Sequence, residues 1–330
     1  MKWLLAALAA MLTAAAFPLK AQEAPAWFAD TLLEMPDDVA DAAKHGKRVM
    51  LYFGQDGCPY CKRLMEVNFR QAPIAAKAKK NLVAIALNIW GDREVKWTDG
   101  AVTSEKQLAA KLKVQFTPTL IFLDEKGSVA LRLNGYLPPH EFEAALDYVA
   151  AKMERKKVAF PDYLGSKTRP AAREALNAQS FFLAGPHDLR RSAGGKPLAV
   201  IFETPQCGQC DELHAVGFKR HEVLAQLSRF DVVRLSMLDS APLLAPDGTS
   251  RVPAAWARDL NVGYVPAIVL FDAQGREAFR TEAYLRPFHL AAALEYVSSG
   301  AYTRERSFQR FLQTKADAMR ARGERVDLWN

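Results

Sequence analysis

Apolar runs and amphipathic stretches alternate along the first half of the chain. Runs rich in β-branched and aromatic residues predict strands, and stretches with helical periodicity predict helices. The predicted strands are 48–53, 81–89, 119–123 and 129–133, and the predicted helices are 62–69, 105–112 and 141–155. The last helix places Phe142, Leu146 and Val149 on one face, as expected for a helix that packs on a sheet. The pattern predicts an α/β unit in which helices flank a central mixed sheet.

The second half repeats this pattern. Its predicted elements are 197–202, 230–235, 254–260, 267–271, 278–281 and 287–298. Shifting the chain against itself by 148 residues brings Pro118 onto Pro266 and Tyr136 onto Tyr284, in unchanged order. The chain is therefore expected to hold two tandem copies of one domain.

The repeat also predicts where the domains end. The expected division is a signal peptide at 1–21, a first domain at 22–157, a linker with a helix at 158–189, a second domain at 190–303 and a helical tail at 304–330. The linker helix is predicted at 170–184. The tail helix is predicted at 304–322, with an apolar face formed by Phe308, Phe311, Leu312 and Met319.

Composition and charge narrow the function classes. The chain has 330 residues, of which 50% are hydrophobic and 25% are charged, as is typical of globular proteins. The net charge of +7 is spread without a basic block, so no nucleic-acid partner is expected. Lys2, the apolar run 3–17 and Pro18 precede a plausible cleavage site at Ala21, and the run is too short to span a bilayer. We therefore expect an exported, periplasmic protein.

The chain's four cysteines form two Cys-X-X-Cys pairs, Cys58 with Cys61 and Cys207 with Cys210. Disulfides between such close residues close very small loops and add little stability, so the spacing points to chemistry. Each pair follows a predicted strand and begins a predicted helix, where free backbone N–H groups stabilise a thiolate. Cys58 and Cys207 are the expected nucleophiles, and Cys61 and Cys210 the resolving thiols.

A proline stands before a buried strand in both copies. Pro118 and Pro266 suit cis peptide bonds at turns that face the cysteines, because a cis bond is cheap only before proline. The expected substrate-binding residues are Thr117, Pro118, Val265, Pro266, Pro59 and Tyr60.

The order of strand, Cys-X-X-Cys, helix and proline before a hairpin resembles the thioredoxin superfamily over about residues 40–152 and 190–300. The first half, with FGQDGCPYCKRL, LNIWGDREV and KVQFTPTLIFLDEKG, is similar to periplasmic proteins of the SoxW type. The resemblance implies a thiol-disulfide oxidoreductase and assigns the redox roles to Cys58, Cys61, Pro118, Cys207, Cys210 and Pro266. Typical thioredoxins carry a tryptophan and a buried aspartate where this chain has Gly57 and Tyr52 in one copy and Gln206 and Ile201 in the other.

The function expected is reduction of protein disulfides, with no cofactor besides the two redox-active disulfides. The partners expected are protein thiols or disulfides and a membrane electron-transfer protein of the thiol-disulfide type. Isomerase or oxidase activity is an alternative, because sequence does not fix a redox potential. A Cu(I) or zinc carrier is another, although the long gap between Cys61 and Cys207 argues against one shared zinc site.

Two further features are open to two interpretations. The insert 88–104, with Trp90 and Trp97, forms a substrate groove or merely caps the domain. His214 is interpreted as a surface or packing histidine rather than a catalytic one.

The two centres differ in charge, because Lys62 and Arg63 follow the first pair whereas Asp211 and Glu212 follow the second. This predicts a lower thiol pKa at the first centre, unless all four side chains point into water and are screened.

Overall fold

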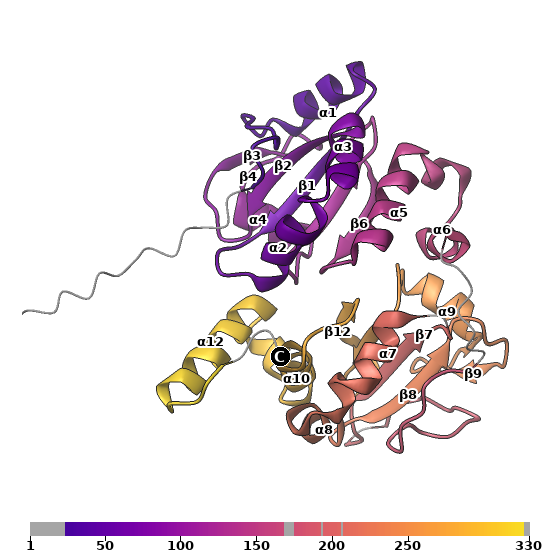
Figure 1. Cartoon of the computed structure of the whole chain (residues 1–330). Helices are drawn as coiled ribbons and strands as arrows, with labels where there is room; N and C mark the ends of the chain where they lie inside the picture. Colours follow the sequence, from indigo (N-terminus) through magenta and orange to yellow (C-terminus); the bar gives the residue numbers. More distant parts are fainter. Residues whose placement is uncertain (1–23, 168–174, 193, 206, 327–330) are drawn as a thin grey trace, which may run out of the picture.

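The computed structural model describes residues 24–167, 175–192, 194–205 and 207–326. It contains two four-stranded sheets of the same topology, one in each half of the chain. Figure 1 shows the first domain in indigo to magenta above the second in red to orange, with the yellow helix α12 beside both. Among these residues, no helix is long and apolar enough to cross a membrane.

The first domain is built on a sheet in the order β2-β1-β5-β6. Strands β1 and β2 are parallel, and β5 is antiparallel to both β1 and β6. The strands are β1 (Arg48–Gly54), β2 (Leu82–Asn88), β5 (Thr119–Leu123) and β6 (Val129–Asn134), with the small hairpin β3 (Glu94–Lys96) and β4 (Val102–Ser104). The helices are α1 (Met35–Lys44), α2 (Pro59–Arg63), the π-helical η1 (Leu64–Asn68), α3 (Ala72–Asn81), α4 (Glu105–Lys111), α5 (Pro139–Ala150), the 3-10 helix η2 (Met153–Lys156) and α6 (Phe160–Lys167).

Alternation along β1 divides the first domain into two cores. Met50 and Tyr52 face the layer that contains α2, α3 and α5. Val49, Leu51 and Phe53 face the opposite layer, formed with α1, α4 and the insert. Because both faces are covered, every residue of β1 is buried, as expected for a central strand.

The second domain repeats the sheet in the order β8-β7-β11-β12. Its strands are β7 (Leu198–Glu203), β8 (Asp231–Ser236), β11 (Ala267–Phe271) and β12 (Glu277–Glu282), with the short pair β9 (Leu243–Leu244) and β10 (Ser250–Arg251). Its helices are α7 (Gly208–Ala215), the 3-10 helix η3 (Gly217–Lys219), α8 (His221–Leu227), α9 (Pro253–Asp259) and α10 (Pro287–Ser298), followed by α11 (Ala301–Arg304) and α12 (Phe308–Ala321). The predicted α/β class and the tandem sheets are confirmed.

The linker differs from the prediction. Residues 175–184 contain no helix, and residues 170–174 lie outside the part of the chain that the structure describes. Helix α6 instead precedes this segment and packs against α5, where Phe160 is buried. Gly185 and Pro186, which do not favour helix, follow this segment directly. The apolar residues of 170–184 alone therefore did not justify the prediction of a helix.

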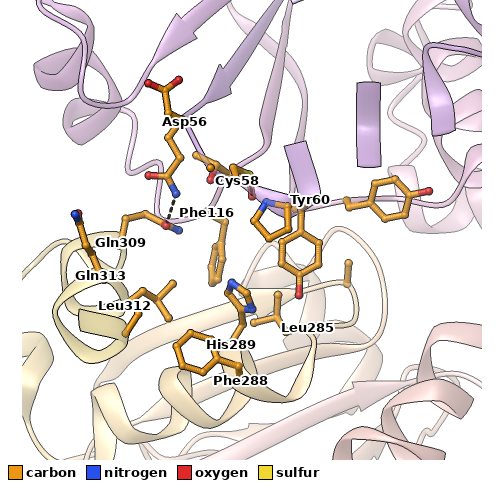
Figure 2. Close-up of a pocket in the computed structure, with 18 of the residues that line it drawn as sticks. Asp56, Cys58, Tyr60, Phe116, Leu285, Phe288, His289, Gln309, Leu312 and Gln313 are labelled. Atoms are coloured by element: carbon orange, nitrogen blue, oxygen red, sulfur yellow. Dashed lines mark hydrogen bonds between the residues drawn. The ribbon is translucent and has the colours of Figure 1, made fainter. Parts of the chain in front are cut away.

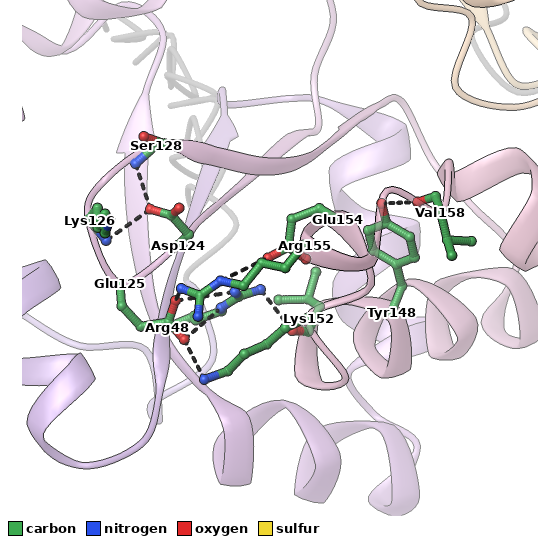
Figure 3. Close-up of polar contacts among 11 residues, drawn as sticks. Arg48, Asp124, Glu125, Lys126, Ser128, Tyr148, Lys152, Glu154, Arg155 and Val158 are labelled. Carbon is green, nitrogen blue, oxygen red and sulfur yellow. Dashed lines mark hydrogen bonds and ion pairs between the residues drawn. The ribbon is translucent and has the colours of Figure 1, made fainter.

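A buried charge cluster fixes the far end of the first domain. Arg48 is only 4% exposed, and its Nη2 contacts Oε2 of Glu125 at 3.2 Å and Oε1 of Glu154 at 2.6 Å. Its Nη1 also donates to the carbonyl oxygen of Val149 at 2.9 Å. Figure 3 shows this cluster at the turn between β5 and β6. The hydrogen bonds from Arg48 and Lys152 outweigh desolvation and lower the pKa of Glu125 to about 2.

The two domains contact each other through positions that the repeat makes equivalent. Phe116 of the first domain packs against Phe279 and Phe308 of the second hydrophobic core, with centroids 5.3 and 5.5 Å apart. Its equivalent Tyr264, 148 positions later, is buried in the core of the first domain. Each domain thus inserts the aromatic residue of its proline loop into the other.

Polar contacts repeat this reciprocity at the centre of the interface. Nδ2 of Asn134 donates to Oε2 of Glu282 at 2.9 Å, and these two residues are themselves 148 positions apart. The backbone N–H of Asn134 donates to the hydroxyl of Tyr264 at 2.7 Å. A residue that contacts its own equivalent lies on a local two-fold axis. The two domains therefore pack like the subunits of a symmetric dimer.

Candidate active site

The first cysteine pair lies where β1 leads into α2. Cys58 is the N-cap of α2 and is disulfide-bonded to Cys61. Its Sγ accepts a hydrogen bond from the backbone N–H of Cys61 at 3.1 Å. Gly57 has a φ of +69°, which explains why glycine rather than a larger residue precedes Cys58. The helix start therefore directs a backbone N–H at the Cys58 sulfur, an arrangement that would stabilise a thiolate once the disulfide is reduced; the thiolate itself stays a prediction.

The proline loop faces this disulfide. The Thr117–Pro118 peptide bond is cis, as is Val265–Pro266 in the second domain, so both predictions are confirmed. The carbonyl oxygen of Thr117 lies 3.3 Å from Sγ of Cys58. Thr117 is only 5% exposed, so its carbonyl is held beside the cysteine by the surrounding core.

A cavity of about 450 Å³ opens beside Cys58. Pro59, Tyr60 and Thr117 line it, together with residues of the second domain and α12. Figure 2 shows Phe288 and His289 of α10 and Leu312 of α12 facing the loop that carries Cys58. The first redox centre therefore opens toward the other domain.

The tail helix is held against the first domain by a chain of side-chain amides. Nε1 of Trp90 donates to Oε1 of Gln55 at 2.7 Å, and Nε2 of Gln55 donates to Oε1 of Gln309 at 2.7 Å. Nε2 of Gln309 then donates to the carbonyl oxygen of Gln115 at 3.1 Å. Trp90 lines the cavity, whereas Trp97 is buried in the core, so the insert both shapes the cavity and caps the domain.

The third residue of each cysteine motif contacts the other domain. The hydroxyl of Tyr60 accepts from the backbone N–H of Arg286 at 2.8 Å, and its ring lies 5.1 Å from that of His289. In the second motif, Nε2 of Gln209 donates to Oε2 of Glu141 at 3.0 Å. His289 and Glu141 are equivalent positions of α10 and α5, so this contact is reciprocal too.

The second centre also begins at a helix N-cap. Cys207 is the N-cap of α7, is disulfide-bonded to Cys210, and accepts from the Cys210 N–H at 3.0 Å. Val265 and Pro266 do not line the cavity beside Cys58; they lie in their own domain, where Val265 packs on the core. The two cysteine pairs thus form two separate centres.

His214 is buried in the second domain. It was expected to be either a surface or a packing histidine, and the structure shows a packing histidine. Its Nε2 lies 2.8 Å from Oε1 of Glu203, and the two side chains are 4% and 1% exposed. His214 follows Cys210 by one turn of α7, and Glu203 ends β7 just before the cysteine loop. Sequence reasoning missed Glu203, whose only signal was an acidic residue at the end of an apolar strand.

Two titratable groups at the domain interface have shifted pKa values. Desolvation raises the pKa of Glu141 to about 7, although the hydrogen bond from Gln209 opposes the shift. Desolvation lowers the pKa of His289 to about 4, so its imidazole is neutral at physiological pH. Burial also raises the pKa of Tyr52, which occupies the position where a thioredoxin would carry its buried aspartate.

The charged residues after the two motifs do not all point freely into water. Nη1 of Arg286 lies 3.2 Å from Oε1 of Glu212, and the guanidinium of Arg63 lies 5.1 Å from the ring centre of Tyr136. Lys62 and Glu66 are 4.0 Å apart and largely exposed. Within the described residues, no group of three or more histidine, cysteine or acidic side chains is placed to hold a metal ion.

Several solved structures resemble one half of the chain. A thioredoxin-fold protein from Helicobacter pylori is 24% identical, with a TM-score of 0.33, and the match covers 43% of this chain and 91% of that one. A thioredoxin from Thermus thermophilus is 27% identical, with a TM-score of 0.31 and coverages of 38% and 90%. The carboxy-terminal domain of Neisseria meningitidis DsbD in the oxidised form is 19% identical, with a TM-score of 0.28 and coverages of 37% and 97%. A search of curated proteins found no match.

A disulfide-bonded Cys-X-X-Cys pair at a helix start, facing a cis-proline loop, defines a thiol-disulfide oxidoreductase centre. The thioredoxin-like domain model matches residues 35–150 and again residues 190–298. The chain belongs to the thioredoxin-like family, with two such domains in tandem. The closer similarity of the first half to SoxW-type proteins stays a prediction.

Proposed function

We propose that the protein is an exported oxidoreductase that reduces the disulfides of protein substrates through Cys58 and Cys61. The observation that carries this proposal is the position of Cys58. Its sulfur caps a helix, lies 3.3 Å from the Thr117 carbonyl oxygen and borders a cavity large enough for a segment of substrate.

The reaction proceeds by two thiol-disulfide exchanges. The Cys58 thiolate attacks one sulfur of the substrate disulfide, which forms a mixed disulfide and releases one substrate thiolate with its electron pair. The Cys61 thiolate then attacks Sγ of Cys58, releases the second substrate thiolate and forms the Cys58–Cys61 disulfide. The substrate gains two electrons, and a dithiol partner must return two electrons to the protein.

Dithiothreitol-dependent reduction of insulin tests the proposal. Cys58→Ser should abolish most of the activity, because it removes the nucleophile, and Cys61→Ser should accumulate mixed disulfides, because it removes the resolving thiol. Gel shifts after thiol alkylation would detect the trapped species. Full activity in the double variant Cys58→Ser, Cys61→Ser would contradict the assignment of these two cysteines as the redox-active pair.

The second centre is proposed to act as a slower relay to the first or as a structural disulfide. The first has Lys62 and Arg63 directly after its cysteine pair, so its nucleophilic thiol should have the lower pKa. Titration of thiolate absorbance in two variants, each with only one cysteine pair, would test this order. Equal or reversed pKa values would refute it.

We further propose a periplasmic location and a membrane electron-transfer partner of the thiol-disulfide type. Support comes from Lys2 and the apolar run 3–17, which have the charge and length of a secretory signal. Residues 1–23 lie outside the described part of the chain. Amino-terminal sequencing of periplasmic material should begin after Ala21, and a start at Met1 would overturn the proposal.

A further inference from the structure

The cavity beside Cys58 belongs to two domains. Its first-domain wall carries the nucleophile, and the opposite wall comes from α10, the loop before it and α12. This second wall supplies the apolar side chains of Leu285, Phe288 and Leu312 and one imidazole, that of His289. A substrate that reaches Cys58 through the cavity must therefore contact the second domain.

His289 has unused hydrogen-bonding capacity in this wall. Its Nδ1 is shielded from solvent and has no hydrogen-bond partner among the described residues. The ring is fixed by edge contacts with Tyr60 and Phe288, at centroid distances of 5.1 and 5.4 Å. A ligand in the cavity cannot reach this shielded atom. Nε2, on the other side of the ring, is not shielded in this way, and no hydrogen bond to it is found among the described residues, so it is the nitrogen that a ligand can bond.

We propose that His289 is a substrate-binding residue of the first redox centre, where its imidazole hydrogen-bonds an extended cysteine-containing peptide whose sulfur reaches Cys58. This inference rests on the proposed function, because it names the substrate class of the same centre. It adds that the second domain is part of the site.

The chemistry of the wall matches a peptide. Nε2 of a neutral imidazole is a donor or an acceptor according to the tautomer, so it can bond either the carbonyl oxygen or the N–H of a peptide. Burial keeps His289 in this neutral form, since its pKa is lowered to about 4. The apolar neighbours suit the carbon atoms of a peptide, and the volume of about 450 Å³ is that of a pocket for a small molecule or a few residues. A folded surface would not fit, so the segment must be a short peptide disulfide or an extended part of a protein.

Single-turnover oxidation of the reduced protein tests this inference. The full mature chain is used with Cys207→Ser and Cys210→Ser, so that only the first centre reacts. Oxidised glutathione serves as the short peptide disulfide and insulin as the protein disulfide, and thiol alkylation after acid quenching measures the rate. The half-saturating concentration reports binding, and the limiting rate reports exchange.

Three variants separate hydrogen bonding from packing. His289→Leu keeps the apolar contacts but loses both nitrogens, and should raise the half-saturating concentration about tenfold with little change in limiting rate. His289→Gln keeps a neutral donor and acceptor and should stay within about threefold of the parent. His221→Leu, at an exposed histidine of the same domain, should change nothing.

The two substrates identify the source of the peptide. If His289→Leu weakens glutathione disulfide alone, the natural ligand is a short peptide disulfide; if it weakens insulin as well, extended protein segments also enter the cavity. Equal effects of leucine and glutamine, or no effect with either substrate, would overturn the inference while leaving a Cys58-dependent reductase intact. Loss of all Cys58-dependent exchange in the parent protein would instead refute the proposed function.

Discussion

Replacement of Glu141 by glutamine should make stability depend on pH in a defined way. Glu141 lies at the domain interface, its side chain is 15% exposed, and its carboxylate accepts a hydrogen bond from Gln209. Desolvation raises its pKa from 4.5 to about 7, so the folded protein binds this proton more tightly than the unfolded chain. Glutamine preserves the acceptor oxygen but cannot ionise.

The sign and size of the effect follow from linkage. Below about pH 4.5 the carboxyl is protonated in both the folded and the unfolded state, so the raised pKa of Glu141 does not lower the free energy of unfolding. As pH rises toward 7 the unfolded chain ionises first, so the native protein loses stability, and above 7 the loss is complete. A shift from 4.5 to about 7 corresponds to about 3 kcal/mol, which is an upper limit because part of the side chain meets solvent.

Urea unfolding followed by circular dichroism would measure this difference. Glu141→Gln should match the parent near pH 4 and exceed its free energy of unfolding by up to about 3 kcal/mol at pH 8. Glu143→Gln is the matched control, because it lies on the same helix in an ion pair with Lys77 and is 43% exposed. A difference that does not vary with pH, or a less stable Glu141→Gln protein at pH 8, would refute the reasoning.

Two further substitutions test other parts of the structure. Arg48→Met removes a buried guanidinium from two partly buried carboxylates and from the Val149 carbonyl oxygen, and should cost about 3 kcal/mol in urea unfolding. Arg190→Met, in a fully exposed ion pair, should leave the free energy of unfolding nearly unchanged. Similar losses in the two variants would contradict the role of burial. Gln313→Trp should fill the cavity and slow disulfide exchange at Cys58 severalfold in alkylation assays, while Thr314→Trp, at an exposed position outside the cavity lining, should not. Equal rates in these two variants would show that substrate does not use the cavity.

Local patterns in the sequence predicted most of each sheet. The strand at 119–123 and the hairpin to β6 were correct because a continuous apolar run and the Asp124–Gly127 turn specify them together. Helices α1 and α3 were missed, although α1 has proline near its start, acidic residues in its first turn and lysine in its last. The predicted helix at 141–155 instead ends at Ala150, where Lys152 adopts a positive φ of 53° that sequence alone does not specify.

The cysteines and prolines of the site were predictable because each motif lies on one short loop. His289 and Glu141 were not, because their importance arises only when the two domains meet. The same holds for Gln309, whose contacts reach back to Gln55 across most of the sequence. Periodicity within a strand or helix carries no information on which side chains face each other across such an interface.

The contact between Asn134 and Glu282 has a consequence for how such a protein could have evolved. In a homodimer of a single ancestral domain, one gene would place the same residue on both sides of the axis. Two buried glutamates facing each other on the axis would repel, so a homodimer interface could not contain an asparagine–glutamate pair there. Duplication and fusion free the two copies to diverge, which permits a donor amide on one side and an acceptor carboxylate on the other. The same freedom allows histidine opposite one cysteine motif and glutamate opposite the other, so a single polypeptide carries two redox centres with different surroundings.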